Sequence, residues 1–162
     1  MEIVFGRVGI SDVDAFLRQL REIGERSGSA VLAIDARFVA GTDHLEAAVT
    51  LARRARERGE AIADDPALEI LLYAAGTRQI DQALTIGVSE DTDVAAIVID
   101  GGDEEAAAAD VRDTVVVEET DPDPDVDAIT GWFDITEAER GATDASLDDL
   151  VRVRVALLTV DR

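Results

Sequence analysis

The hydrophobic and polar positions along the chain follow two periods, and these predict short strands separated by helices. Apolar runs rich in Val, Ile and Phe, which favour strands, occupy residues 2–8, 30–35, 94–100 and 114–119. The run at 94–100, VAAIVID, is apolar on both of its alternating faces. A strand with that pattern is buried on both sides, so we expect it at the centre of the sheet.

Helical periodicity and capping residues divide much of the remaining chain into helices. Apolar residues over 13–23 recur every three or four positions, which is the pattern of an amphipathic helix. Asp65 followed by Pro66 is a typical helix start, and Gly76 is a typical helix end. With Ser11 or Asp12, Asp43, Thr77 and Ser146 as further N-caps, the predicted helices cover 12–26, 43–58, 66–75, 77–86, 103–111, 124–131, 136–140 and 146–158.

The order of these elements predicts the fold class. Several helices fall together between the second and third strands, so the chain is not a series of regular βαβ units. We therefore predict an α+β fold, with a small mixed β-sheet and a cluster of helices packed against it on one side. At this length the chain is expected to form a single domain over residues 1–162.

The composition is typical of a folded protein that works inside the cell. Hydrophobic residues make up 47% of the chain, which is enough to build a core. No run of 18 apolar residues is present, the N-terminus lacks a signal-peptide pattern, and the chain has no Cys. We therefore expect a cytoplasmic protein without a membrane segment, a disulfide or a thiolate metal site.

The net charge of -21 indicates where the protein works more than what it binds. All of the basic residues are Arg, and the carboxylates are spread over most predicted surface positions. This Lys-free, acidic and Ala/Val-rich composition is typical of adaptation to molar intracellular salt. At that salt the Debye length is about 3 Å, so self-repulsion is largely screened. We interpret the charge as haloadaptation.

The charge is nevertheless uneven along the chain. Residues 37–58 contain five arginines against three acids, a balance of +2, whereas residues 89–127 contain fifteen acids against one arginine, a balance of -14. Arg54 and Arg58 are four residues apart on a predicted helix and would be neighbours on its outer face. We expect this part of the surface to tolerate an anion.

Residues that usually carry catalysis are largely missing from the sequence. There is no Walker-type phosphate loop and no Lys to serve one, no G-x-S-x-G and no Cys/His pair. His44 is the single His, and its place beside Asp43 at a predicted helix start indicates a surface or cap-adjacent position. We expect a protein that is not an enzyme and that needs neither a cofactor nor a metal.

Clustered acids and the Gly101-Gly102 pair allow two further readings. Asp100, Asp103 and Glu104 could form an acidic Mg²⁺ site, although helix capping and solvation explain them more simply. IVIDGGDEE superficially resembles a phosphate-binding turn, but acids at the helix start would repel a phosphate. A tight strand-to-helix turn is the preferred interpretation, and a small-ligand enzyme domain around these glycines is the least favoured.

The tract 70–87, ILLYAAGTRQIDQALTIG, places polar residues directly after the most hydrophobic helix. Residues 70–75 are apolar nearly all round, which is typical of a helix that is buried or faces a partner. Arg78 and Gln79 would then lie in the first turn of the next helix, where the helix dipole disfavours an Arg. Two interpretations stay open on these residues: packing and capping, or contacts to a phosphate or a base edge.

The tract EILLYAAGTRQIDQA at 69–83 resembles the signature of the PRPK-binding-protein family, the small non-catalytic subunit of the KEOPS complex in its archaeal form. FDIT at 133–136 and LVRVRVALLTV at 150–160 support the resemblance, which extends over essentially the whole chain. It implies a role in threonylcarbamoyladenosine modification of tRNA. The subunit would bind the N-lobe of a kinase-like ATPase subunit and hold the single-stranded CCA end of the tRNA. We expect no DNA and no membrane partner.

The resemblance also implies site residues, carried over position by position. The tRNA-binding residues would be Tyr73, Gly76, Thr77, Arg78, Gln79 and Ile80. By charge alone, the candidates for phosphate contacts are Arg54 and Arg58, with Arg53 and Arg56 beside them. The kinase-binding residues are guessed to be Val151, Val155 and Leu158, which would suit a core equally well.

One departure from the family pattern supports a rival reading. The turn before the signature helix often holds an Asn and a basic residue in the family, whereas Ala61 and Asp64 stand here. The chain could therefore be a pure protein adaptor that stabilises or regulates the kinase-like subunit without binding RNA. If it does bind RNA in molar salt, we expect stacking, apolar packing and base hydrogen bonds to matter more than phosphate contacts.

Overall fold

Four strands pair in the order β2-β3-β1-β4, and each of these pairings is antiparallel. The computed structural model describes residues 1–159. Its strands are β1 (Glu2–Arg7), β2 (Ala30–Asp35), β3 (Val94–Asp100) and β4 (Glu118–Glu119). The predicted α+β fold class and the central place of the 94–100 strand are confirmed. The strand directions differ from the prediction, since the sheet is antiparallel and not mixed.

The chain divides into two compact units. The first unit contains Met1–Ala36 and Thr85–Asp123, and the second contains Arg37–Leu84 and the described residues from Pro124 onward. The helices of the first unit are α1 (Val13–Ser27) and α5 (Glu104–Thr114). Those of the second are α2 (Thr42–Glu57), α3 (Pro66–Ala75), α4 (Ile80–Ala83), α6 (Val126–Phe133), α7 (Glu137–Gly141) and α8 (Leu147–Leu157). Short 3-10 turns cover Ala36–Phe38 and Leu84–Ile86. The expected single domain over 1–162 stays a prediction.

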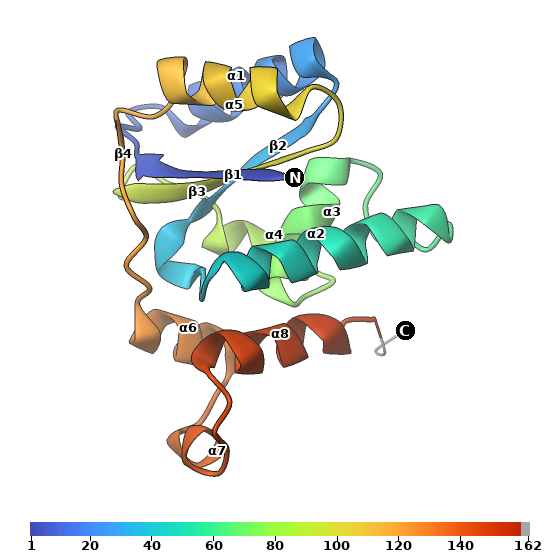
Figure 1. Ribbon diagram of the computed structural model, residues 1–162, viewed down its shortest axis with the longest axis vertical. Helices are drawn as coiled ribbons and strands as arrows, with labels where there is room; N and C mark the ends of the chain where they lie inside the picture. Colours follow the sequence, from blue (N-terminus) through green and yellow to red (C-terminus); the bar gives the residue numbers. More distant parts are fainter. Residues whose placement is uncertain (160–162) are drawn as a thin grey trace. The chain divides into compact units, whose positions relative to one another are not determined.

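In the first unit, α1 and α5 lie side by side on one face of the sheet (Figure 1). Leu20 of α1 and Val111 of α5 belong to the same buried cluster as Ile97 of β3. The alternate residues of β3, Ala96 and Val98, are fully buried as well. The apolar pattern of this strand therefore reflects burial on both of its faces.

The predicted strand at 114–119 is wrong over most of its length. α5 continues to its C-cap Val115, because Val111 and Val115 recur at helical spacing and both enter the buried cluster. Only the pair of residues at 118–119 joins the sheet, as β4 beside β1.

The Gly101-Gly102 pair forms a tight strand-to-helix turn, as predicted. Gly102 has a φ of 58°, and a Cβ there would lie 2.4 Å from the carbonyl oxygen of Ser27. The Asp103 carboxylate accepts a hydrogen bond from a backbone N–H of α5 at 3.1 Å, and Glu104 accepts one from Gly101 at 2.6 Å. These acids serve the helix start. In residues 1–159 no group of three His, Cys, Asp or Glu side chains is arranged to hold a metal ion.

In the second unit, α2 packs against α3 and α8, and the predicted bounds of α3 are confirmed. Asp65 is its N-cap, and Gly76 ends it with a φ of 67°. The prediction that Asp43 caps α2 is wrong, because the N-cap is Gly41 and makes no side-chain bond. A Cβ on Gly41 would lie 2.5 Å from a carboxylate oxygen of Asp148, so a side chain at this cap would require the Asp148 carboxylate to move. Among the described residues, no helix is long and apolar enough to cross a bilayer.

Glu69 is a fully buried carboxylate that holds the loop before α3. Its oxygens accept hydrogen bonds from the backbone N–H of Ile62 at 3.0 and 2.8 Å and of Ala63 at 3.1 Å. On the same loop, Arg56 of α2 donates to the carbonyl of Asp64 at 3.0 Å. The loop is therefore held to both neighbouring helices through its backbone.

His44 is buried, so the predicted surface position is wrong, whereas the predicted cap-adjacent position is confirmed, since His44 lies in the first turn of α2. Its Nε2 lies 2.8 Å from the carbonyl oxygen of Ala74, and its Nδ1 accepts the N–H of Ala40 at 3.2 Å. This pair of contacts fits a neutral ring with its proton on Nε2. Its edge meets the ring of Phe133 at a centroid distance of 5.6 Å. Burial lowers the pKa of His44 to about 4, and the bond to Ala74 opposes this shift only in part.

The first prediction concerns Glu69. We expect Glu69→Gln to lower the free energy of unfolding by about 1–3 kcal/mol, because the amide offers one acceptor oxygen where two served buried N–H groups. Glu69→Ala is expected to cost more. Chemical denaturation of the full chain measures both, with Glu57→Gln on the exposed side of α2 as the matched control, expected within about 0.5 kcal/mol of the wild type. An unchanged Glu69→Gln variant contradicts this role.

The second prediction concerns His44 and pH. The unfolded chain binds a proton at His44 below its ordinary pKa of 6.5, while the folded chain excludes that proton down to about pH 4. Stability is therefore lost as the pH falls through this window, by about 3 kcal/mol in full. In His44→Gln, which keeps a side-chain N–H donor but does not titrate, we expect this component to vanish. Denaturation curves at several pH values test it, and parallel pH dependences of the two proteins would contradict it.

Candidate functional site

The segment after α3 is a turn, so the prediction that Arg78 and Gln79 lie in the first turn of a helix is wrong. α4 begins only at Ile80. The backbone of Gln79 is extended, and its N–H is bonded to the Thr77 hydroxyl at 3.2 Å. This side-chain bond competes with a helical one and delays the helix start. The dipole argument against an Arg in this position therefore does not apply.

The residues of this turn differ in their access to solvent. Arg78 and Gln79 are exposed, and Ile80 is an exposed large hydrophobic residue at 44%. Gly76 and Thr77 are half-buried. Tyr73 is only 1% exposed, because it belongs to a helix that is apolar nearly all round and buried on nearly every side. Its ring cannot stack on an external base in this structure, which corrects its predicted place among surface contacts.

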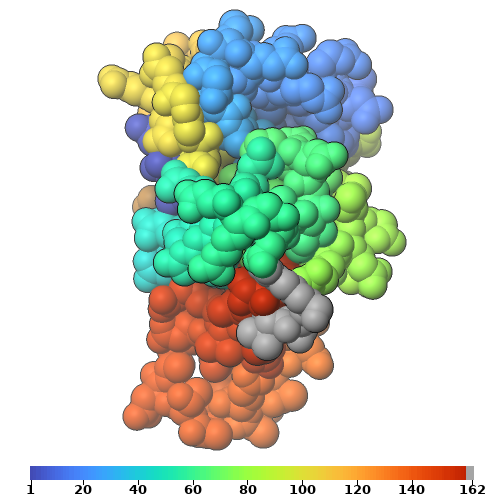
Figure 2. All heavy atoms as spheres, turned by 90° about the vertical axis from the view of Figure 1, so that its right-hand side faces the viewer, coloured from blue at the N-terminus to red at the C-terminus, as the bar shows by residue number. Residues whose placement is uncertain are grey.

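The turn reaches the end of α8. The guanidinium of Arg78 donates to the carbonyl oxygen of Leu158, the C-cap of that helix, at 3.5 Å. Figure 2 shows this face of the second unit, with α2 in green, the segment around residue 80 in yellow-green and α8 in red. No local sequence pattern predicts this contact, because the two residues are 80 positions apart in the chain.

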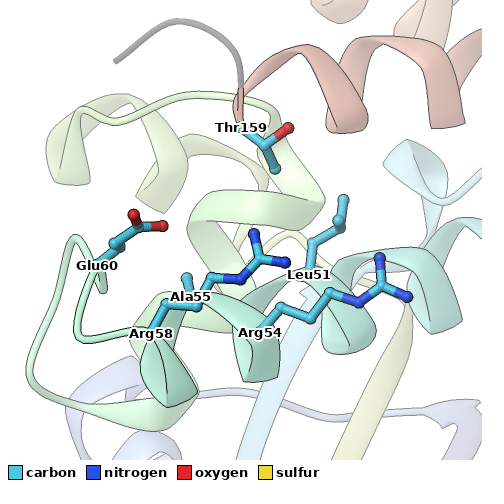
Figure 3. Close-up of a pocket in the computed structure, with 6 residues that line it drawn as sticks. All are labelled: Leu51, Arg54, Ala55, Arg58, Glu60 and Thr159. Atoms are coloured by element: carbon cyan, nitrogen blue, oxygen red, sulfur yellow. The ribbon is translucent and has the colours of Figure 1, made fainter.

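Arg54 of α2 and Arg58, the C-cap of that helix, line one cavity. The cavity has a volume of about 250 Å³. Figure 3 shows both guanidinium groups on the same side of α2, with Leu51 near them and Thr159 across the cavity. Glu60 also lines it. Thr159 directly follows Leu158, so this cavity and the Arg78 contact meet at the same end of α8.

The arginines of this region are in different states. Among the described residues, Arg54, Arg58 and Arg78 form no ion pair with a carboxylate. Arg56 is bonded to a backbone carbonyl of the preceding loop, and Arg53 is exposed on α2 but does not line the cavity. Within the part of the chain that the structure describes, the site therefore holds three guanidinium groups without an acid partner, although the chain has a net charge of -21.

The residues guessed for kinase binding lie in the core. Val151 and Val155 are fully buried and Leu158 is 4% exposed. Their side chains face inward from α8, so they are not available to a partner on the surface. The exposed apolar residues of the same helix are Val153 at 52% and Leu157 at 46%.

Two side chains that the sequence did not connect with the turn hold the end of α3. His44 of α2 bonds the carbonyl of Ala74, and the indole N–H of Trp132 from α6 donates to the carbonyl of Ala75 at 2.9 Å. A signal for His44 was present, because it lies four residues before Ala48 on the apolar face of α2. No local pattern connects Trp132 with α3.

Comparison with known proteins identifies a family. A search of curated proteins finds none that matches the chain. The profile of a family described as "Kinase binding protein CGI-121" matches residues 9–159. This range extends from the end of β1 to the last described residue and includes every residue of the arginine site. By this match the chain belongs to the CGI-121 family of kinase binding proteins.

Proposed function

We propose that the protein is the small, non-catalytic subunit of the KEOPS complex, which makes threonylcarbamoyladenosine in tRNA, in a haloadapted archaeal form. In this role it binds the kinase-like ATPase subunit and holds the CCA 3′ end of the tRNA, which recruits the substrate. Membership of a kinase-binding family supports the first half of the proposal. The observation that carries the second half is the meeting of Arg54, Arg58 and Arg78 at the end of α8.

These three arginines come from α2, its C-cap and the turn after α3, yet they border two consecutive residues, Leu158 and Thr159. Arg78 contacts Leu158, and Thr159 lines the cavity of the other two. Each lacks an acid partner among the described residues, although acids outnumber arginines in the chain by 36 to 15. Guanidinium groups that have no acid partner within residues 1–159 suit the phosphates of a flexible single strand.

The turn adds groups that suit unpaired bases. The exposed amide of Gln79 can donate to and accept from a base edge, and the exposed side chain of Ile80 offers an apolar surface. Gly76 contributes its left-handed backbone, with a φ of 67°, to the start of this turn, and the side where a Cβ would stand faces Phe133. Since Tyr73 is buried, the apolar contact falls to Ile80.

Salt determines which of these contacts matter. At molar salt the phosphate contribution to affinity is strongly reduced, whereas packing and base hydrogen bonds are less affected. Three phosphate contacts to a single strand correspond to a slope of log K against log salt of about -2. The proposed site therefore combines a weak electrostatic contribution with a salt-resistant one at Gln79 and Ile80.

The pure adaptor is the second candidate, and one observation favours it. The loop that departs from the family pattern at Ala61 and Asp64 is held by Arg56, whose guanidinium is bonded to the Asp64 carbonyl. This bond leaves Arg56 less available to a phosphate. An adaptor would need a kinase contact but no RNA contact.

For the kinase contact we propose the exposed face of α8. Val153 and Leu157 are four residues apart on one helix and are therefore neighbours on its surface. They replace the buried Val151, Val155 and Leu158 as candidates, because only exposed apolar side chains can be covered by a partner without opening the core.

The third prediction tests RNA binding. We expect the full chain to bind intact tRNA more tightly than the same tRNA without CCA, in KCl at about 1 M. Arg78→Ala is expected to weaken the CCA-dependent binding about tenfold, because it removes a charged donor from the turn. Arg140→Ala, which removes an exposed arginine of α7, is the matched control and is expected to change nothing. If neither RNA binds, with or without the kinase-like subunit, the result supports the adaptor instead.

The fourth prediction tests the kinase contact. Val153→Glu with Leu157→Glu should weaken binding of the kinase-like subunit at least tenfold, because charges would replace apolar surface at the interface. Unfolding temperature should change little, since both side chains are exposed. Leu17→Glu, on the exposed side of α1, is the control for a general effect of added charge. Unchanged binding by the double variant would remove α8 from the kinase surface.

A further inference from the structure

The last four carbonyls of α3 are all bonded, and the last two of them depend on side chains from other helices. The carbonyl of Leu72 accepts from Thr77 N–H at 3.2 Å, and that of Tyr73 accepts from Gly76 N–H at 3.1 Å. These backbone bonds are the usual end of a helix with a left-handed glycine. The carbonyls of Ala74 and Ala75 have no such partners, and His44 and Trp132 supply them (at 2.8 and 2.9 Å).

Aromatic side chains of α2 and α6 also pack around the start of the turn. A Cβ on Gly76 would lie 3.5 Å from the ring of Phe133, the neighbour of Trp132. The edge of the His44 ring meets Phe133, and the Trp132 ring meets Phe38 at 6.2 Å. The turn thus leaves α3 against aromatic side chains of α2 and α6.

The short helix α6 is itself anchored to α8. The guanidinium of Arg154 donates to the carbonyl of Phe133 at 3.1 Å and to that of Asp134 at 3.2 Å. It also forms a two-pronged ion pair with Glu139, at 2.6 and 2.8 Å. The backbone next to Trp132 is therefore held in place by Arg154 of α8. The end of the same helix provides the Leu158 carbonyl that Arg78 contacts.

We infer that Trp132 is a positioning residue for the RNA-binding turn, with His44 as its second anchor. Trp132 bonds the last carbonyl of α3 and so sets the direction in which the chain continues to Arg78, without touching the RNA itself. This inference rests on the proposed function. It adds that the affinity for the CCA end depends on an indole N–H more than fifty residues away in the sequence.

The test is a double-mutant cycle on the full chain with intact tRNA and tRNA lacking CCA. Trp132→Phe keeps an aromatic ring but removes the N–H donor, and it is expected to weaken CCA-dependent binding about three- to tenfold. If Trp132 acts through the turn, Trp132→Phe should have little further effect when Arg78→Ala is already present. Combined with Arg58→Ala, which lies on α2, its effect should be additive.

A matched control separates positioning from general loss of stability. Thr92→Val removes a buried hydroxyl bonded to the Asp35 carboxylate at 3.0 Å, in the first unit. It should lower the unfolding temperature without changing affinity for the CCA end. Because Trp132 is the single Trp, 3-benzothienylalanine can also be placed there alone, with sulfur where the indole has its N–H. This isostere keeps the ring size and serves if Trp132→Phe fails to fold.

The outcomes distinguish this inference from the proposed function. If the wild type shows no CCA-dependent binding, the proposed function fails and the inference fails with it. If the wild type binds and Arg78→Ala weakens binding, but Trp132→Phe and the isostere bind like the wild type, only the positioning role is overturned. Additive effects of Trp132→Phe and Arg78→Ala overturn it as well. Weaker binding with non-additivity toward Arg78→Ala and additivity toward Arg58→Ala supports it.

Discussion

The arrangement of the second unit depends on how α3 ends. This helix is buried on nearly every side, so its last carbonyls cannot be left to water and need partners within the protein. Two of them are bonded through the turn itself and two through His44 and Trp132. The requirement to satisfy four backbone groups therefore ties α2, α3 and α6 together. It also explains why a single His, in a chain so rich in surface charge, is kept neutral in a core.

The parts of the fold that the sequence predicted well are those decided locally. Asp12, Asp65 and Ser146 cap their helices as expected, because an N-cap bonds a backbone N–H only two or three residues ahead. The predicted strand at 114–119 is wrong over most of its length for the opposite reason. Valine favours strands locally, but burial of Val111 and Val115 in the first unit carries the helix to a C-cap at Val115, and only residues 118–119 pair with β1.

The candidate site shows the same division. Arg54 and Arg58 could be placed together from their spacing, since four residues are about one helical turn. Their proximity to Arg78 could not be predicted in this way, because it depends on where the end of α8 lies. Arg78 contacts Leu158, and Thr159 lines the cavity of the other two arginines. The burial of Tyr73 followed from the apolar tract around it, yet the resemblance to a family had suggested a contact. A residue shared with a family signature can serve the fold of the site instead of its surface.

Trp132 has a consequence for how the molecule can be observed. It is the single tryptophan of the chain, its indole is half-buried, and its N–H is engaged at the end of α3. The single tyrosine, Tyr73, is buried in that same helix, two residues before the carbonyl that the indole bonds. Fluorescence emission from the native protein therefore comes almost entirely from Trp132, the side chain that bonds the last carbonyl of α3. The molecule carries an intrinsic fluorophore at the end of α3, without any attached label.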